Sequence, residues 1–159
     1  PVRSARVEFR HGQLHDFAIM ENWALRDWLK AARRPVEIGH NQLVIEMIAS
    51  YGMPVGKEVF ETCVWIGRFI EAHPVGHTFL YRAEVKLHLC NSTRAKDANV
   101  RQAILDYYGG KAAAVGTKRN PGPLYGVHKD VWAALGVALT WKAEPSRWPG
   151  RIAACEADA

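Results

Sequence analysis

The first residues of the chain alternate between apolar and polar. Between residues 4 and 9 every second side chain is apolar, which is the two-residue period of a half-buried strand. A His-Gly pair follows at positions 11 and 12, and a second apolar-rich stretch covers 14–19. The pattern therefore predicts a β-hairpin over residues 4–19.

After the hairpin the spacing of apolar residues becomes helical, interrupted by short β-branched or aromatic runs. The two short runs, 43–46 and 78–81, predict strands, and the first reads as a buried central strand. The segment 109–126 holds five glycines and two prolines and is predicted to be a loop. The predicted helices cover 21–33, 59–71, 85–90, 95–108 and 131–141. A hairpin followed by alternating helices and strands is typical of a three-layer α/β domain.

Composition narrows the class of protein. The chain has 159 residues, of which 48% are hydrophobic and 23% charged, as expected for one globular domain with a real core. We expect that domain to cover residues 1–145, with a tail over 146–159. No apolar run approaches the roughly 18 residues that span a bilayer, and no leader is evident, so a cytoplasmic protein without a membrane partner is predicted. The three cysteines lack metal-ligand spacing, which predicts no zinc site.

Charge points to a polyanionic partner. The net charge is +5, and the segment 91–120 alone contains six basic and two acidic residues, a net charge of +4. Such a concentration suits contacts with nucleic-acid phosphates, although a solvated charged face would look the same. The larger aromatic side chains are predicted to belong to the core rather than to a base-stacking surface: Trp23, Trp28, Phe60, Trp65 and Phe69.

Three residues could carry chemistry. Glu46 directly follows Leu-Val-Ile, and a carboxylate at the end of a buried strand is costly unless it is paired, reaches solvent or binds a cation. In open α/β sheets ligands bind at that end of the strands. Asp130 begins an apolar, small-residue helix, where an aspartate is ordinarily a cap. His128 precedes the same helix and on its own suggests only a solvated side chain.

Four segments, in this order, resemble RuvC-type Holliday junction resolvases of the RNase H-like superfamily, above all phage-borne or shortened members. They run from Pro1 to about Thr140: Pro1-Val-Arg-Ser-Ala5, Leu43-Val-Ile-Glu46, Val85-Lys86 with Arg94-Ala-Lys96, and Asp130-Val-Trp-Ala-Ala-Leu-Gly-Val-Ala-Leu-Thr140. The resemblance implies an RNase H-like three-layer α/β fold with a mixed central sheet flanked by helices. It also implies a homodimer that cuts four-way DNA junctions with the help of Mg²⁺, or of Mn²⁺.

The resemblance assigns roles to residues of this chain. Glu46 and Asp130 match two catalytic, metal-binding acids of the family, and His128 is a candidate replacement ligand. The residues expected to contact DNA are Lys86, Arg94, Lys96, Lys118 and Arg119. The helix 59–71 is expected to form the dimer face through Trp65 and Phe69.

Two departures from the family pattern leave alternatives open. The family's first acid lies in a strand that would precede Pro1, so we expect the central strand to be missing from this sequence. Its fourth acid falls on Ala133. A non-catalytic nucleic-acid-binding module of the same fold therefore stays possible, as does a nuclease for forks, flaps or RNA-containing duplexes. An unrelated small α/β protein is the third alternative.

Overall fold

The computed structural model describes residues 2–32, 42–50, 52, 54–73 and 76–143. All the predicted strands and helices are present, with ends that move by at most three residues. The strands are β1 (Arg3–Arg10), β2 (Gln13–Glu21), β3 (Leu43–Met47) and β4 (His77–Tyr81). The helices are α1 (Asn22–Ala31), α2 (Lys57–Ala72), α3 (Arg82–Cys90), α4 (Asp97–Tyr107), α5 (Lys111–Ala114) and α6 (Val131–Ala143).

The strands form two separate ladders. β1 and β2 pair as the predicted antiparallel hairpin, with Val7 opposite Phe17. β3 and β4 pair in parallel, with Glu46 opposite Leu80. No hydrogen-bonded ladder joins β1 to β3 among the described residues, so the mixed strand layer consists of two halves.

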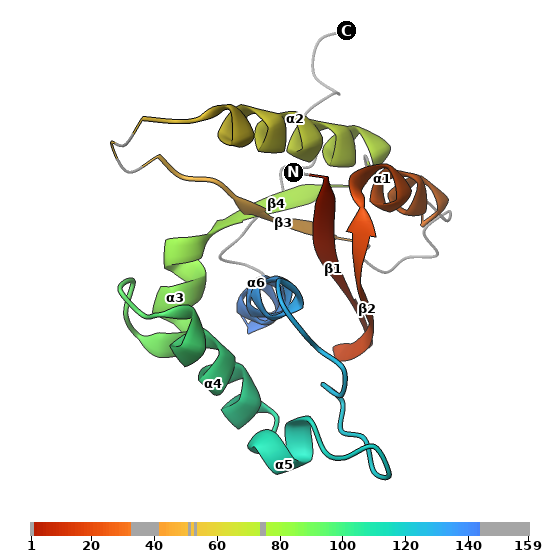
Figure 1. Ribbon diagram of the computed structural model, residues 1–159, viewed down its shortest axis with the longest axis vertical. Coiled ribbons are helices and arrows are strands. Elements are labelled where there is room, and N and C mark those ends of the chain that lie inside the picture. The colour runs from red at the N-terminus through yellow and green to blue at the C-terminus, as the bar shows by residue number, and fades with distance from the viewer. Residues whose placement is uncertain (1, 33–41, 51, 53, 74–75, 144–159) are drawn as a thin grey trace, which may run out of the picture.

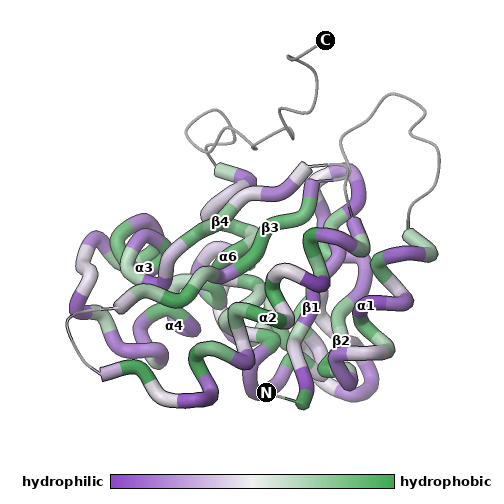
Figure 2. Tube along the Cα trace, turned by 90° about the horizontal axis from the view of Figure 1, so that it is seen from above, coloured by the Kyte–Doolittle hydropathy of each residue, from purple (hydrophilic) through white to green (hydrophobic). Residues whose placement is uncertain are grey.

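Helix α6 holds the two halves together. It is apolar on all sides, and from Val131 to Lys142 none of its residues is exposed. A helix of that composition is stable only when it is buried all round. It packs against β1 and β2, against β3, and against α3 and α4 (Figure 1). Figure 2 shows the apolar stretches of β3, β4 and α6 gathered at the centre of the molecule.

Helices α1 and α2 cover the opposite side of the strands. Leu25 and Leu29 of α1 form a second cluster with Phe69 and Ala72 of α2, against which Met20 and Leu43 of the strands also pack. Figure 1 shows α2 on one side of β3 and β4 and α6 on the other. The predicted three-layer α/β architecture is therefore confirmed.

The prediction that residues 109–126 form only a loop was wrong. The segment contains α5 and a hydrogen-bonded turn in which Gly116 and Pro121 form an isolated bridge. Gly122 allows close packing of the backbone here rather than backbone flexibility. A Cβ at this position would lie 2.3 Å from the carbonyl oxygen of Ala113. Leu124 and Val127 then enter the core beside α6, so the segment is anchored at both ends.

The candidate tail 146–159 lies outside the described residues. None of the helices described in the structure is long and apolar enough to cross a membrane.

Candidate functional site

Glu46 lies where the sequence places it, near the carboxyl end of β3. Its side chain is about two thirds covered, with 34% of its surface exposed. Val44, two residues earlier on the same face of the strand, packs with Leu80 and Val85 in the core. The carboxylate therefore stands at the boundary between the core and the solvent.

Arg82 is the closest cation to Glu46. Its Nη1 lies 3.6 Å from Oε1 of Glu46, and its Nη2 donates a hydrogen bond of 2.6 Å to Oδ1 of Asp97. Lys86, one turn later on α3, has its Nζ 4.0 Å from the same Oδ1. Two acids and two cations thus form one network across β3, α3 and α4.

The two acids of this network respond differently to their surroundings. Burial raises the pKa of Glu46, and the nearby Arg82 guanidinium offsets only part of that effect. The hydrogen bond from Arg82 lowers the pKa of Asp97, because it stabilises the charged carboxylate. Burial and the cations therefore oppose each other at Glu46, whereas at the exposed Asp97 the cations prevail and the pKa is lowered.

A shallow cavity opens beside Glu46. It has a volume of about 280 Å³ and is lined by Glu46, Met47, Ile48, Ala49 and Arg82. The carboxylate and the guanidinium are its two charged groups, and the other lining side chains are apolar. An anion in this cavity would be attracted by the guanidinium and repelled by the carboxylate.

The second predicted acid occupies a different position. Asp130 is exposed and immediately precedes α6, and its carbonyl oxygen accepts a hydrogen bond from the Ala134 amide, as at an ordinary helix start. His128 is also exposed, with its Nδ1 2.8 Å from the carbonyl oxygen of Gly126. Ala133 is half-buried on the first turn of α6. None of these residues lines the cavity beside Glu46.

The predicted DNA-contacting residues divide into two sets. Lys118 and Arg119 are exposed at the tip of the turn in which Thr117 and Asn120 exchange backbone hydrogen bonds. Arg94 and Lys96 are exposed just before α4. Lys86 is instead mostly covered, and its ammonium group points to Asp97.

The residues described do not by themselves make a metal site. They contain no group of three or more His, Cys, Asp or Glu side chains placed to hold a metal ion. Glu46 has a guanidinium beside it, where a bound cation would need a second carboxylate. The donor set near Glu46 therefore does not fit a complete Mg²⁺ or Mn²⁺ site.

Sequence reasoning missed Arg82 and Asp97. The parallel register sets Met47 opposite Tyr81, so Arg82 follows the end of β4 just as Glu46 precedes the end of β3. A signal existed in the four-residue spacing of Arg82 and Lys86 directly after an apolar strand. Asp97 carried no such signal, because only the return of α4 brings it to Arg82.

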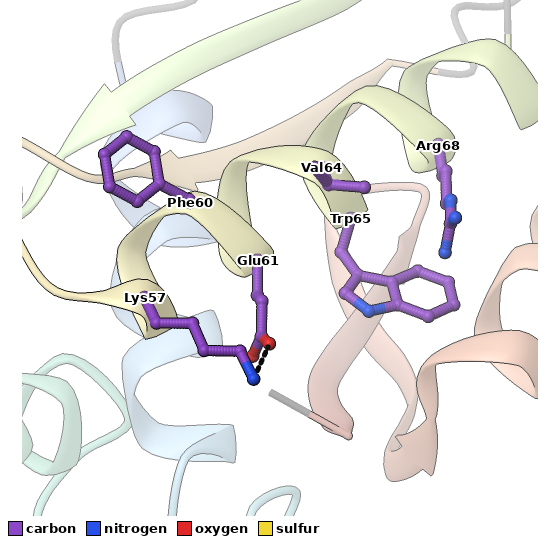
Figure 3. Close-up of a pocket in the computed structure, with 6 residues that line it drawn as sticks. All are labelled: Lys57, Phe60, Glu61, Val64, Trp65 and Arg68. Atoms are coloured by element: carbon purple, nitrogen blue, oxygen red, sulfur yellow. Dashed lines mark ion pairs between the residues drawn. The ribbon is translucent and has the colours of Figure 1, made fainter.

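The outward face of α2 is a second surface of interest. Phe60 and Val64 are 60% and 55% exposed, and a shallow depression of about 350 Å³ lies along them. Figure 3 shows the Lys57–Glu61 ion pair at one end and Arg68 beside the Trp65 indole at the other.

This surface corrects two predictions about aromatic residues. Phe60 and Trp23 are exposed rather than in the core, while Phe69 is buried and cannot form a dimer face. The ring of Trp65 packs edge-on against Trp23, with ring centroids 5.0 Å apart. Trp28, on α1, is half-buried and packs against the apolar cluster that α1 forms with α2.

Comparison with known proteins gives one informative result. No protein-family model and no curated protein matches the sequence. The solved structure of RuvC from Thermus thermophilus superimposes with a TM-score of 0.55 at 14% sequence identity, covering 93% of this chain and 90% of that one. The chain shares the fold of RuvC. At this identity the likeness establishes the fold, and activity rests on the residues of this chain.

Proposed function

We propose that the protein is an endonuclease of the RNase H-like type that cuts DNA at four-way junctions. The observation that carries the proposal is the position of Glu46. It lies near the carboxyl end of the half-buried strand β3, beside a cavity, in a fold shared with RuvC over 93% of the chain. Ligands in open α/β folds bind at that end of the strands.

In this proposal Glu46 and Asp130 are the acids of the reaction, with His128 as an auxiliary ligand and Mg²⁺ or Mn²⁺ as the cofactor. These assignments follow from the resemblance of the two motifs to the resolvases. Because the described residues do not complete a metal site, the roles of the two acids are tested separately from the binding of DNA.

DNA binding is proposed to involve the exposed basic residues that flank α4 and α5: Arg94, Lys96, Lys118 and Arg119. Their exposure supports the proposal, since a phosphate contact requires an accessible cation. Of these, Lys118 and Arg119 stand on a turn whose backbone is fixed by reciprocal hydrogen bonds.

We also propose a homodimer formed through α2. Phe60, Val64 and Gly67 follow one another at helical spacing on its exposed face, and a Cβ on Gly67 would meet no atom of the described residues within 4 Å. A glycine inside a helix costs about 1 kcal/mol relative to alanine. Its use here is explained if Phe60 of a second copy packs over Gly67.

The charges on this face favour an antiparallel pair of α2 helices about a two-fold axis. In that pairing Lys57 lies opposite Glu71 of the second copy, and Glu61 lies opposite Arg68. A parallel pairing would instead place identical charges next to each other. The dimer is therefore proposed to be antiparallel at α2.

A non-catalytic nucleic-acid-binding module is the second candidate. The pairing of Glu46 with Arg82 favours it, as does the lack of a three-member acidic group among the described residues. The two candidates agree on DNA binding and differ on cleavage.

The deciding experiment measures cleavage and binding together. The product of the complete coding sequence is incubated with a labelled four-way junction and with a linear duplex, in Mg²⁺, in Mn²⁺ and in EDTA. We expect metal-dependent paired nicks in the junction, lost in Glu46→Gln while binding in EDTA is kept. Binding without any metal-dependent cutting would favour the second candidate.

A further inference from the structure

We propose that Arg82 and Lys86 form a phosphate-binding pair beside Glu46, and that Asp97 occupies the phosphate position until DNA displaces it. The proposal rests on the proposed binding of DNA and adds to it a competing group within the protein. It assigns a role to Arg82 and Asp97, for which the sequence suggested none.

The geometry of the two cations is the first observation. Arg82 and Lys86 lie one turn apart on α3, and both approach a single oxygen, Oδ1 of Asp97, at 2.6 and 4.0 Å. Their side chains are only 25% and 22% exposed, so their direction is set by packing rather than by solvent. A guanidinium and an ammonium converging on one anionic oxygen form the arrangement that a phosphate oxygen accepts.

The second observation is the exposure of the acid that they hold. The side chain of Asp97 is 76% exposed at the start of α4, so solvent and large ligands reach it. Ion pairs of exposed groups contribute little to stability, because solvent screens them. Asp97 can therefore leave the cations at small cost, and a phosphodiester has further oxygens to offer.

The third observation is a spare donor. The Nη1 atom of Arg82 is covered and makes no hydrogen bond within the part of the chain that the structure describes. It lies on the side of the guanidinium that faces Glu46 and the cavity. Its ion pair with Glu46 is, at 3.6 Å, too long to be a hydrogen bond, so a phosphate oxygen at this position would supply a hydrogen bond that the free protein lacks.

The surroundings indicate DNA as the source of the phosphate. Arg94 and Lys96 are exposed in the connection that leads from α3 to Asp97. A nucleic-acid backbone that follows these cations would bring one phosphate to Arg82 and hence next to Glu46. Asp97 then weakens every complex in which that phosphate is seated.

The test compares two substitutions of equal charge. Asp97→Asn removes the competing acid, and Asp106→Asn, on the same helix, makes the same change of net charge at a carboxylate bonded to Gln102. Binding to a four-way junction is measured by fluorescence anisotropy in EDTA over a range of salt concentrations. Circular dichroism checks the fold of each variant.

We expect Asp97→Asn to bind the junction about two- to fivefold more tightly, which is the change in affinity expected when one exposed ion pair no longer has to be broken. Its salt slope should change by clearly less than the 0.9 of a whole phosphate contact, because DNA contacts the same number of phosphates in both proteins. Asp106→Asn should leave the affinity nearly unchanged. Equal effects of the two substitutions would overturn the proposal, since net charge alone would then explain them.

A second pair of variants tests the cations. In the Asp97→Asn background, Lys86→Gln or Arg82→Gln should remove the gain in affinity. If the loss of Arg82 unfolds the protein, the Lys86→Gln variant still provides the test. Persistence of the full gain in a folded double variant would refute the assignment.

Titration with inorganic phosphate at constant ionic strength distinguishes a site for DNA phosphates from a site for free phosphate. Saturation at millimolar phosphate with no preference for DNA would replace the DNA site by a small-anion site.

These measurements are independent of catalysis. If the Asp97→Asn gain appears and no metal condition yields cleavage, the phosphate site stands and the endonuclease proposal fails. If cleavage occurs and the two Asn variants bind DNA alike, the endonuclease proposal stands and the phosphate site fails.

Discussion

At the scale of the residue, the environment of Glu46 is a balance between burial and counter-charge. The covered position of its carboxylate disfavours the charged form, and Arg82 at 3.6 Å favours it. The pKa is raised, so burial outweighs the guanidinium. Folding therefore stabilises the protonated form of Glu46 relative to the unfolded chain, and ionising it at neutral pH lowers the stability of the native state.

The substitution Glu46→Gln should accordingly increase the free energy of unfolding at pH 7. The increase should disappear as the pH falls below the ordinary pKa of a glutamate, because Glu46 is then protonated in both states. Urea denaturation at pH 7 and at pH 3.5 measures the difference. The same substitution at Glu21, an exposed acid paired with Arg3, serves as the control. A loss of stability at pH 7 would mean that the Arg82 pair dominates.

At the scale of the element, the segment between α4 and α6 presents charge on a fixed turn. The bridge between Gly116 and Pro121 closes the turn, and a Cβ on Gly116 would lie 2.3 Å from the carbonyl oxygen of Asn120. Gly116 also has a φ of +65°, which favours glycine. The turn therefore holds Lys118 and Arg119 in place without using either side chain.

Replacing Lys118 and Arg119 together by Ala should reduce the salt slope of log affinity for DNA by about two contacts, each worth roughly 0.9. Junction and duplex DNA should be affected alike, since phosphate contacts carry no sequence information. The melting temperature should hardly change, because both side chains are exposed. The control removes the same charge from the hairpin and α1, through Arg3→Ala with Lys30→Ala. An unaltered slope in the first variant would place the DNA surface elsewhere.

At the scale of the whole molecule, two strand ladders and their covering helices depend on α6. Because α6 contacts both ladders, displacing it would expose the core on both sides at once. The faces of α1 and α2 that point away from the strands remain open. The proposed dimer would cover part of α2 and relate two copies of the Glu46 site by a two-fold axis.

The substitution Gly67→Leu tests that assembly. Among the residues that the structure describes, no atom outside the helix lies within 4 Å of the position of its Cβ, and leucine is the better helix former by roughly 1 kcal/mol. The fold of each subunit should therefore be kept or slightly stabilised, while the dimer dissociates at least tenfold more readily by sedimentation equilibrium. Glu58→Leu adds the same side chain to α2 outside the Phe60–Gly67 stripe and should leave the dimer intact. Unchanged dissociation in Gly67→Leu, or a monomeric parent, would reject the α2 interface.

The sequence alone determined the order and type of the elements, with the exception of α5. The alternation before residue 10, the Leu-Val-Ile run before Glu46 and the uniformly apolar α6 are local patterns, and each predicts its element because periodicity reflects which faces are buried. The same local pattern located Glu46 at a strand end. Helix α5 was not predicted. The glycines of 109–126 indicate a loop and a close approach of two backbone segments equally well.

Only the tertiary structure decided which charges meet. Glu46, Arg82 and Asp97 are separated by 36 and 15 residues, and no local pattern relates them. The parallel pairing of β3 with β4 brings Arg82 to Glu46, and the return of α4 beside α3 brings Asp97 to Arg82. The exposure of Phe60 and the burial of Phe69 were likewise decided by the side of α2 that packs on α1. Periodicity marks a buried face, but the partner of each face is set by long-range packing, and so the charged cavity beside Glu46 is defined only by the tertiary structure.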